Sequence, residues 1–194
     1  MINPIPKAST KDFGDPSQYR GITISSAVYK LYCAILNNRL THFVEMNHIL
    51  ADEQNGFRKD RGCQDHIFTL ASVLENRKLS GLSTFTAFID FKSAFDRIDR
   101  DALFYKLLKC GINGNMYNAI KSLYSSIIST VRINGLYTNW FDIKNGVRQG
   151  CLMSTTLFNI FLNDLVAEIN NLNLGIYTGR NQHLSILAYA DDII

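Results

Sequence analysis

The sequence predicts an α+β fold in which helices cover a sheet. Three observations indicate it. Apolar residues recur at helical spacing over two long segments, 26–44 and 154–169. The β-branched and aromatic run "STFTAFIDF" at 83–91 is short enough to be a buried strand. The dipeptide Asn134-Gly135 lies between two further β-prone runs and is a strong signal for a β-hairpin.

Two helices are predicted before the strand run. The first extends from Ser26 to Val44, and the second from about Asp65 to Arg77. The residues expected to form the apolar face of the first are Val28, Leu31, Tyr32, Ile35, Leu36, Leu40 and Phe43, and those expected to face inward from the second are Ile67, Leu70, Val73 and Leu74.

Three more helices are predicted after the strand run. Residues 100–111 form one, with Asp101 in its first turn and Gly111 as its C-terminal stop. Another spans about 115–126, and Ser154 is expected to cap the last. The apolar face of that last helix is Leu157, Phe158, Phe161, Leu162, Leu165 and Ile169. The final run "LSILAYADDII" is expected to form a strand, a turn and the start of another strand.

Composition narrows the class of protein. The 194 residues carry 20 Lys and Arg against 17 Asp and Glu, which allows a nucleic-acid partner without requiring one. The four cysteines are widely spaced, with no zinc-site pattern, so we expect a reduced, intracellular protein of the cytoplasm, the nucleus or both. No apolar run has signal-peptide or bilayer-spanning length, so we expect no membrane partner.

Adjacent carboxylates in an apolar run are the clearest chemical signal. Asp191 and Asp192 lie in "LAYADDII" with no basic neighbour, and Asp90 ends the predicted strand "FTAFID". A single Asp-Asp pair is usually a solvated turn or a helix cap. If the two strands are neighbours, however, three carboxylates converge and need cations. Oxygen ligands without His or Cys favour Mg²⁺, and two such ions about 3.5–4 Å apart suit phosphoryl transfer.

These segments closely resemble reverse transcriptases, especially those of non-LTR (LINE-like) retrotransposons. "AFIDFKSAFDRIDRDAL", "NGVRQGCLMSTTLFNIFLNDL" and "LAYADD" resemble the three catalytic palm motifs, in order. "PIPKASTKDFGDPSQYRGITI" and "LADEQNGFRKDRGCQDHIFTL" look like finger motifs. The resemblance implies a right-hand polymerase with partial fingers at 1–80 and a ferredoxin-like antiparallel palm at 81–194. It also implies that the palm is truncated after its third motif and that the thumb is missing.

The same resemblance implies the site residues. Asp90, Asp191 and Asp192 are the catalytic, metal-binding aspartates, for two Mg²⁺ ions with Mn²⁺ as a possible substitute. The implied dNTP-binding residues are Lys7 and Arg20 on the triphosphate, Phe95 against the sugar 2′-carbon and Gln149 beside the incoming nucleotide. The implied template-binding residues are Gln54, Gly56, Arg58 and Gly150. On composition alone, Lys7 and Arg20 are ordinary surface cations. Phe57 could equally be an ordinary core residue, and Gly150 could equally be an ordinary turn residue.

Two departures from the family pattern lie outside the catalytic positions. Leu152-Met153-Ser154-Thr155 stands where relatives commonly have Pro-Leu-Ser-Pro, and Asp60 stands where a Gly is usual. Lost prolines loosen a loop, and an Asp adds repulsion near a template. Both departures bear on efficiency more than on the class of activity.

The implied activity is RNA-directed DNA polymerisation, in which a DNA primer 3′-OH attacks a dNTP on an RNA template. Because the thumb and primer grip are expected to be missing, we expect this chain alone to be inactive. The alternative from another class is a non-catalytic remnant that at most binds nucleic acid. An RNA-dependent RNA polymerase fits less well, because its third motif is usually Gly-Asp-Asp and Phe95 disfavours ribonucleotides. The sequence leaves the oligomeric state open.

Overall fold

The computed structural model describes residues 1–9, 11–179 and 182–194. Two compact units are present, and each is built from two separate segments. Unit 1 comprises Met1–Phe43 with Phe95–Phe158, and unit 2 comprises Val44–Ala94 with Asn159–Ile194. The predicted division into fingers at 1–80 and palm at 81–194 concerns functional subdomains and not compact units, and it stays a prediction.

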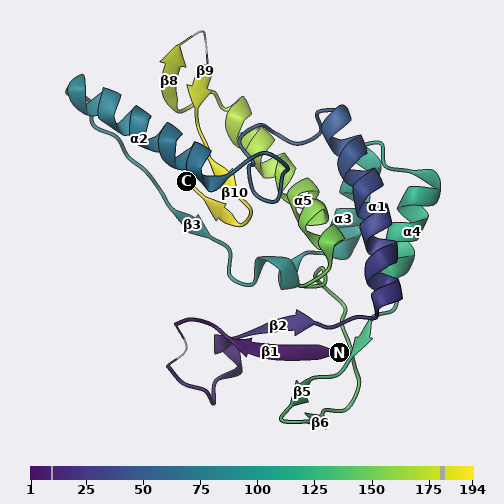
Figure 1. The fold of residues 1–194 in the computed structure, drawn as a ribbon. Coiled ribbons are helices and arrows are strands. Elements are labelled where there is room, and N and C mark those ends of the chain that lie inside the picture. Colours follow the sequence, from purple (N-terminus) through teal and green to yellow (C-terminus); the bar gives the residue numbers. More distant parts are fainter. Residues whose placement is uncertain (10, 180–181) are drawn as a thin grey trace. The chain divides into compact units, whose positions relative to one another are not determined.

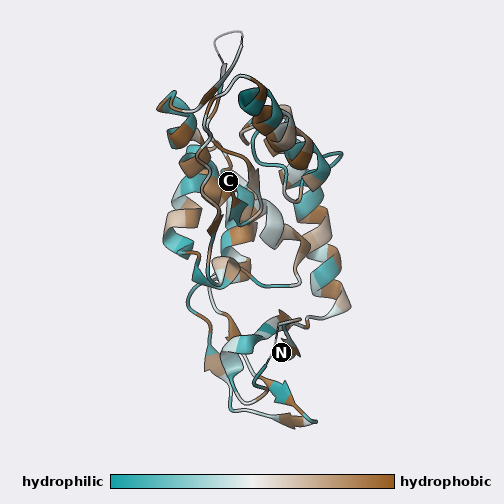
Figure 2. Cartoon of the chain, turned by 90° about the vertical axis from the view of Figure 1, so that its left-hand side faces the viewer, coloured by the Kyte–Doolittle hydropathy of each residue, from teal (hydrophilic) through white to brown (hydrophobic). Residues whose placement is uncertain are grey.

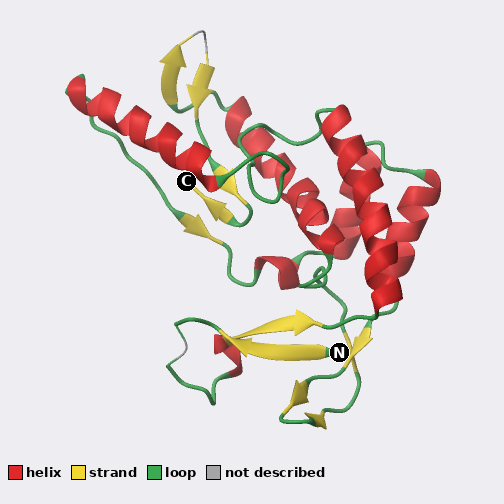
Figure 3. Ribbon diagram, in the orientation of Figure 1, coloured by secondary structure: helices red, strands yellow, loops and turns green. Residues whose placement is uncertain are grey.

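Helices and short antiparallel strands alternate along the chain (Figures 1 and 3). The elements that begin in unit 1 are β1 Ile2–Pro6, η1 Pro16–Gln18, β2 Tyr19–Thr23, α1 Ala27–Met46, α3 Arg100–Lys109, α4 Gly114–Tyr124, β4 Ile128–Ser129, β5 Arg132–Ile133, β6 Leu136–Tyr137, β7 Phe141–Asp142 and α5 Leu152–Asn171. Those that begin in unit 2 are α2 Cys63–Leu79, β3 Ile89–Asp90, η2 Ala94–Arg97, β8 Ile176–Gly179, β9 Gln182–Leu184, β10 Ala188–Tyr189 and β11 Asp192–Ile193. None of the helices in the described ranges combines the length and the apolar character needed to cross a bilayer.

All five predicted helices are confirmed, and α3 ends as the sequence indicated. The Asp99 side chain caps α3 by accepting a hydrogen bond from the Ala102 amide at 2.9 Å. Gly111 follows α3 with a φ of +82°, the left-handed conformation that glycine adopts readily. Ser154, by contrast, is not a cap, because α5 begins two residues earlier; its side chain is buried and lies 3.3 Å from the Tyr124 hydroxyl.

The buried face of α1 differs from the predicted one. Leu36 and Leu40 are buried as expected, together with Cys33 and Val44. The other predicted positions are exposed: Val28, Leu31, Tyr32, Ile35 and Phe43. Apolar residues extend around more than one side of this helix, and only one side packs against the core. Figure 2 shows that apolar (brown) and polar (teal) residues alternate along the helices of the chain.

The burial predicted for α2 and α5 is also only partly correct. In α2, Ile67 is 64% exposed and Leu74 is 40% exposed. Leu70 and Val73 line an apolar groove of about 320 Å³ together with Phe85, Ile89 and Ile193. In α5, Leu157, Phe158 and Leu162 are buried, whereas Leu165 is exposed. An open groove therefore replaces the closed packing that was expected beside α2.

The predicted buried strand at 83–91 is wrong in extent and in burial. Only Ile89 and Asp90 join a sheet, and both are exposed. Phe85 is 96% exposed and Phe88 is 74% exposed. The sheet has three strands, in the order β10-β11-β3, and each contributes two residues. A sheet this small cannot cover both faces of a nine-residue run.

Two hairpins match their sequence signals. Asn134 and Gly135 both have positive φ, at +49° and +82°, and connect β5 to β6 with Ile133 opposite Leu136. This is the two-residue turn that Asn-Gly favours. At the C-terminal end, β10 and β11 pair with Tyr189 opposite Asp192, so the predicted strand, turn and strand are confirmed.

Candidate functional site

Three aspartates lie at one edge of the sheet in unit 2. Strand β3 pairs antiparallel with β11, and Asp90 lies directly opposite Asp192. Asp191 occupies the turn between β10 and β11, one residue before Asp192. Asp90 and Asp192 are exposed and Asp191 is half-buried. Two segments far apart in the sequence therefore meet where the isolated carboxylates predicted that they would.

The chemistry of this edge suits a hard cation. Residues directly opposite each other in an antiparallel pair point to the same face, with Cβ atoms about 4.5–5.5 Å apart, and like charges there destabilise the pair. An oxygen-binding cation removes that penalty. Within the described ranges, however, no three His, Cys, Asp or Glu side chains form a group that could hold a metal ion. The donor types and the backbone register fit, while three-carboxylate coordination stays a prediction.

The segment before α2 packs against the turn that carries Asp191. The Ala188 amide donates to the Glu53 carbonyl at 2.9 Å, and the Asn55 amide donates to the Ala188 carbonyl at 2.9 Å. Gly56 approaches closest: a Cβ at this position would lie 2.1 Å from the Ala190 nitrogen. The residue must therefore be glycine for space.

Two of the predicted template-binding side chains are engaged inside unit 2. Gln54 is 2% exposed and bonds to Ala190. Arg58 donates to both Glu45 carboxylate oxygens, at 2.9 and 2.7 Å, and to the carbonyls of Ala51 and Gln54. This pairing with Arg58 holds the pKa of Glu45 below its usual value. A template contact by Gln54, Gly56 and Arg58 stays a prediction.

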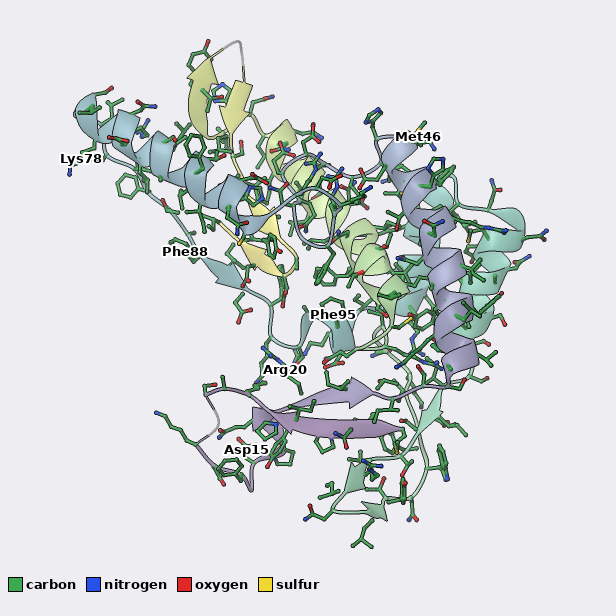
Figure 4. All side chains as sticks on the ribbon, in the orientation of Figure 1. Asp15, Arg20, Met46, Lys78, Phe88 and Phe95 are labelled. Atoms are coloured by element: carbon green, nitrogen blue, oxygen red, sulfur yellow. The ribbon has the colours of Figure 1, made fainter. Side chains whose placement is uncertain are left out.

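The predicted dNTP-binding residues all lie in unit 1. Lys7 and Arg20 belong to the hairpin of β1 and β2, in which Arg20 pairs with Ile5 (Figure 4). Both side chains are exposed, and the Lys7 ammonium donates to the Ser17 carbonyl at 2.9 Å. Their exposure leaves them accessible to a phosphate.

Phe95 and Gln149 are held by neighbours within unit 1. The Phe95 ring stacks on Phe158, with ring centroids 4.8 Å apart and an interplanar angle of 17°. The Gln149 side-chain nitrogen donates to both carboxylate oxygens of Asp96 at 2.9 Å, and the Gln149 backbone carbonyl accepts from the Thr23 amide at 2.9 Å. Both side chains therefore have a defined direction.

Gly150 adopts a backbone conformation that suits glycine. Its φ is +98°, and a Cβ would lie 3.1 Å from the Thr23 carbonyl oxygen. The residue is exposed. Both the predicted turn and the predicted close approach of backbone are therefore available at this position.

Three supporting residues were missed by the sequence reasoning. Asp96 orients Gln149, as described above. Asn159 is buried and donates to the Gly56 carbonyl at 2.7 Å. The His66 Nε2 lies 3.0 Å from the Glu53 carbonyl and 3.1 Å from the Ala188 carbonyl, so it is the protonated nitrogen. The available signal for Asn159 was its place as a single polar residue inside the apolar run 157–162 of α5.

A family model described as "Reverse transcriptase (RNA-dependent DNA polymerase)" matches residues 5–194. The chain belongs to the reverse transcriptase family. The three predicted palm motifs all lie within the matched residues.

Curated relatives of this reverse transcriptase chain come from non-LTR retrotransposons. It is 29% identical over 185 residues to the Pol polyprotein of type-1 retrotransposable element R2 of Popillia japonica, covering 94% of this chain and 25% of that protein. It is 28% identical over 179 residues to the probable RNA-directed DNA polymerase from transposon BS of Drosophila melanogaster, covering 92% and 19%. The chain therefore spans about a quarter or less of the length of these relatives.

Solved structures show the same fold. Apo telomerase of Candida tropicalis, truncated from its C-terminal domain, aligns with a TM-score of 0.60 at 16% identity, over 99% of this chain and 42% of that one. Telomerase of Candida albicans in complex with a fragment of telomeric RNA aligns with a TM-score of 0.61 at 13% identity, over 99% and 36%. The predicted α+β class, with the fingers and palm of a polymerase, is confirmed.

Proposed function

We propose that this reverse transcriptase chain carries the catalytic residues of an RNA-directed DNA polymerase, which transfers a nucleotide from a dNTP to a DNA primer 3′-OH on an RNA template. The observation that carries the proposal is the register of the sheet, with Asp90 opposite Asp192 and Asp191 in the adjoining turn. The predicted intracellular location agrees with these substrates.

In this proposal Asp90, Asp191 and Asp192 hold two Mg²⁺ ions, for which Mn²⁺ can substitute. Bound divalent cations lower the pKa of the attacking hydroxyl and stabilise charge on the transferred phosphate. The aspartates supply the oxygen ligands and fix the direction of in-line attack. Short side chains on a paired backbone suit this task because they lose little conformational entropy when they bind.

The residues of unit 1 bind and select the nucleotide in the same proposal. Lys7 and Arg20 bind the triphosphate, Phe95 packs against the sugar, and Gln149 lines the nucleotide. The Asp96 carboxylate can accept only from the amide nitrogen of Gln149, which leaves the Gln149 amide oxygen as the acceptor for a nucleotide donor. Gly150 offers exposed backbone to the template base, and Gln54, Gly56 and Arg58 support the template strand through the backbone that they hold.

The test is primer extension by a fusion protein. In this protein, Ile194 is followed by the segment of the Popillia japonica R2 polyprotein that comes after its aligned region. We expect Mg²⁺-dependent dNTP incorporation on a primed RNA template. Asp90→Asn and Asp191→Asn should each lower the rate by at least about 10³-fold, because each removes charge needed at the transferred phosphate. Asp142→Asn, at an exposed aspartate on β7, is the control and should keep the wild-type rate.

The alternative, a non-catalytic remnant, predicts a different result. Under this alternative, the extended protein would bind the primed template, and neither its wild-type form nor its aspartate variants would incorporate dNTPs.

The 194-residue chain without added residues is a separate case. It is expected to bind the primed template without extending the primer. Template-dependent incorporation by that chain, abolished by Asp191→Asn, would contradict the expectation that a thumb is required.

Phe95→Ala in the same extended protein is expected to admit ribonucleotides. The ring leaves no room for a 2′-OH and a methyl group does, so discrimination between dNTP and rNTP should fall at least about tenfold, or about 1.4 kcal/mol. Rates with single dNTPs and rNTPs measure it. Phe68→Ala is the control, because Phe68 is an exposed aromatic on α2. Unchanged discrimination in Phe95→Ala would exclude Phe95 from sugar selection.

A further inference from the structure

The Gln54 side chain forms hydrogen bonds with both backbone groups of Ala190, in the turn before Asp191. Its Nε2 donates to the Ala190 carbonyl at 3.2 Å, and its Oε1 accepts from the Ala190 amide at 2.9 Å. The same oxygen accepts from the Gly56 amide at 2.8 Å. Gln54 is 2% exposed and Ala190 is 5% exposed, so water does not compete for these groups.

Ala190 needs this support for a conformational reason. Its φ is +58°, in the left-handed region that costs a non-glycine residue roughly 1 kcal/mol. Ala190 and Asp191 are the two residues of the turn between β10 and β11, since Tyr189 pairs with Asp192. Without a partner on both backbone groups of Ala190, the turn would lose two buried hydrogen bonds and keep its strain.

The position of the Gln54 carboxamide is itself determined by its neighbours. Backbone bonds join Glu53 and Asn55 to Ala188 on either side of Gln54. Asn159 holds the Gly56 carbonyl at 2.7 Å. The carboxamide therefore reaches Ala190 from a fixed backbone rather than from a mobile loop.

We infer that Gln54 is a positioning residue, which sets the backbone of the Ala190-Asp191 turn and thereby aims the Asp191 carboxylate at a divalent cation. The inference rests on the proposed function. Only a carboxamide of this length can donate and accept at one residue: glutamate lacks the donor when ionised, and asparagine is one methylene shorter. Residues that orient metal ligands typically change metal affinity by about 10–100-fold when they are replaced.

The experiment uses the 194-residue chain and Mn²⁺ alone as the probe. Paramagnetic broadening of the NMR signals of Asp90, Asp191 and Asp192 reports binding, and hydrogen exchange of the Ala190 amide reports the turn. In Gln54→Met we expect Ala190 exchange to rise at least about tenfold and Mn²⁺ affinity to fall about tenfold. Gln54→Glu keeps an oxygen that accepts from the Ala190 and Gly56 amides. Exchange of the Ala190 amide should therefore stay low, and Mn²⁺ affinity should fall by less than it does in Gln54→Met.

Asn163→Leu is the matched control in unit 2. Asn163 accepts from the Ala51 amide at 2.8 Å and donates to the Ile49 carbonyl at 2.9 Å, so these two hydrogen bonds go to the segment after α1 and not to the Ala190-Asp191 turn. This variant should lose a similar number of hydrogen bonds and keep wild-type Mn²⁺ affinity. If Gln54→Met does not fold, Gln54→Glu carries the comparison.

The possible outcomes separate the inference from the proposed function. If a folded Gln54 variant binds Mn²⁺ as tightly as the wild-type chain does, the positioning role alone is overturned. An equal loss of affinity in Asn163→Leu would also overturn it, because the effect would then be general destabilisation. No broadening at the three aspartates in the wild-type chain would overturn the metal site of the proposed function, and the inference with it.

Discussion

Gly56→Ala is expected to lower the free energy of unfolding by about 3 kcal/mol or more. The added methyl carbon would lie 2.1 Å from the Ala190 nitrogen, 2.8 Å from its Cα and 2.9 Å from the Tyr189 carbonyl carbon. All three are backbone atoms, so no side-chain rotation relieves the clash. The turn must move, and the bonds that Gln54 and Asn159 make to Gly56 move with it. Urea unfolding followed by far-ultraviolet circular dichroism measures the loss.

Gly81→Ala is the control for this substitution. Gly81 has a φ of +68° with no atom within 4 Å of an added Cβ, so the change tests left-handed strain without a clash. Its expected cost is about 1 kcal/mol. Equal losses in Gly56→Ala and Gly81→Ala would contradict the close approach of Gly56 to the hairpin.

Arg100→Met is expected to cost about 3–4 kcal/mol, through a different mechanism. Arg100 is 9% exposed, and its guanidinium donates to the carbonyls of Gly146, Tyr124, Ile143 and Asn145 at 2.8–3.2 Å. Tyr124 is the last residue of α4, where the helix dipole favours a cation, and its ring centroid lies 5.4 Å from the guanidinium carbon. Burial lowers the pKa of Arg100, but a guanidinium stays charged at neutral pH.

The comparison variants for Arg100 separate charge from geometry. Methionine fills the space of the Arg100 side chain and leaves four carbonyls without this donor. Arg100→Lys keeps the charge but loses the planar guanidinium. We therefore expect lysine to recover less than half of the stability that Arg100→Met loses. Arg97→Met, at an exposed arginine of η2, should change stability by less than about 0.5 kcal/mol. Wild-type stability in Arg100→Lys would show that charge alone is required.

Part of the candidate site could be predicted from the sequence, because the signal for it lies in the residues next to each aspartate. Asp191 and Asp192 in an apolar run, and Asp90 at the end of another, have no local compensation, so their convergence could be predicted. The register of β3 with β11 agrees with that prediction. Gln54 gave no such signal, since its partner Ala190 is 136 residues away and offers only backbone groups.

The sequence by itself determined the family, the five helices, the Asn134-Gly135 hairpin and the meeting of the segments that carry Asp90 and Asp192, because each depends on residue spacing or on a short motif. Only the tertiary structure decided which apolar faces are buried. Val28 and Leu36 follow the same helical pattern in α1, yet one is exposed and the other buried, because burial depends on what packs opposite. The tertiary structure also decided that Gln54 and Gly56 hold the turn before Asp191. Their contacts join segments distant in the chain through hydrogen bonds and close packing, and neither leaves a periodic trace in the sequence.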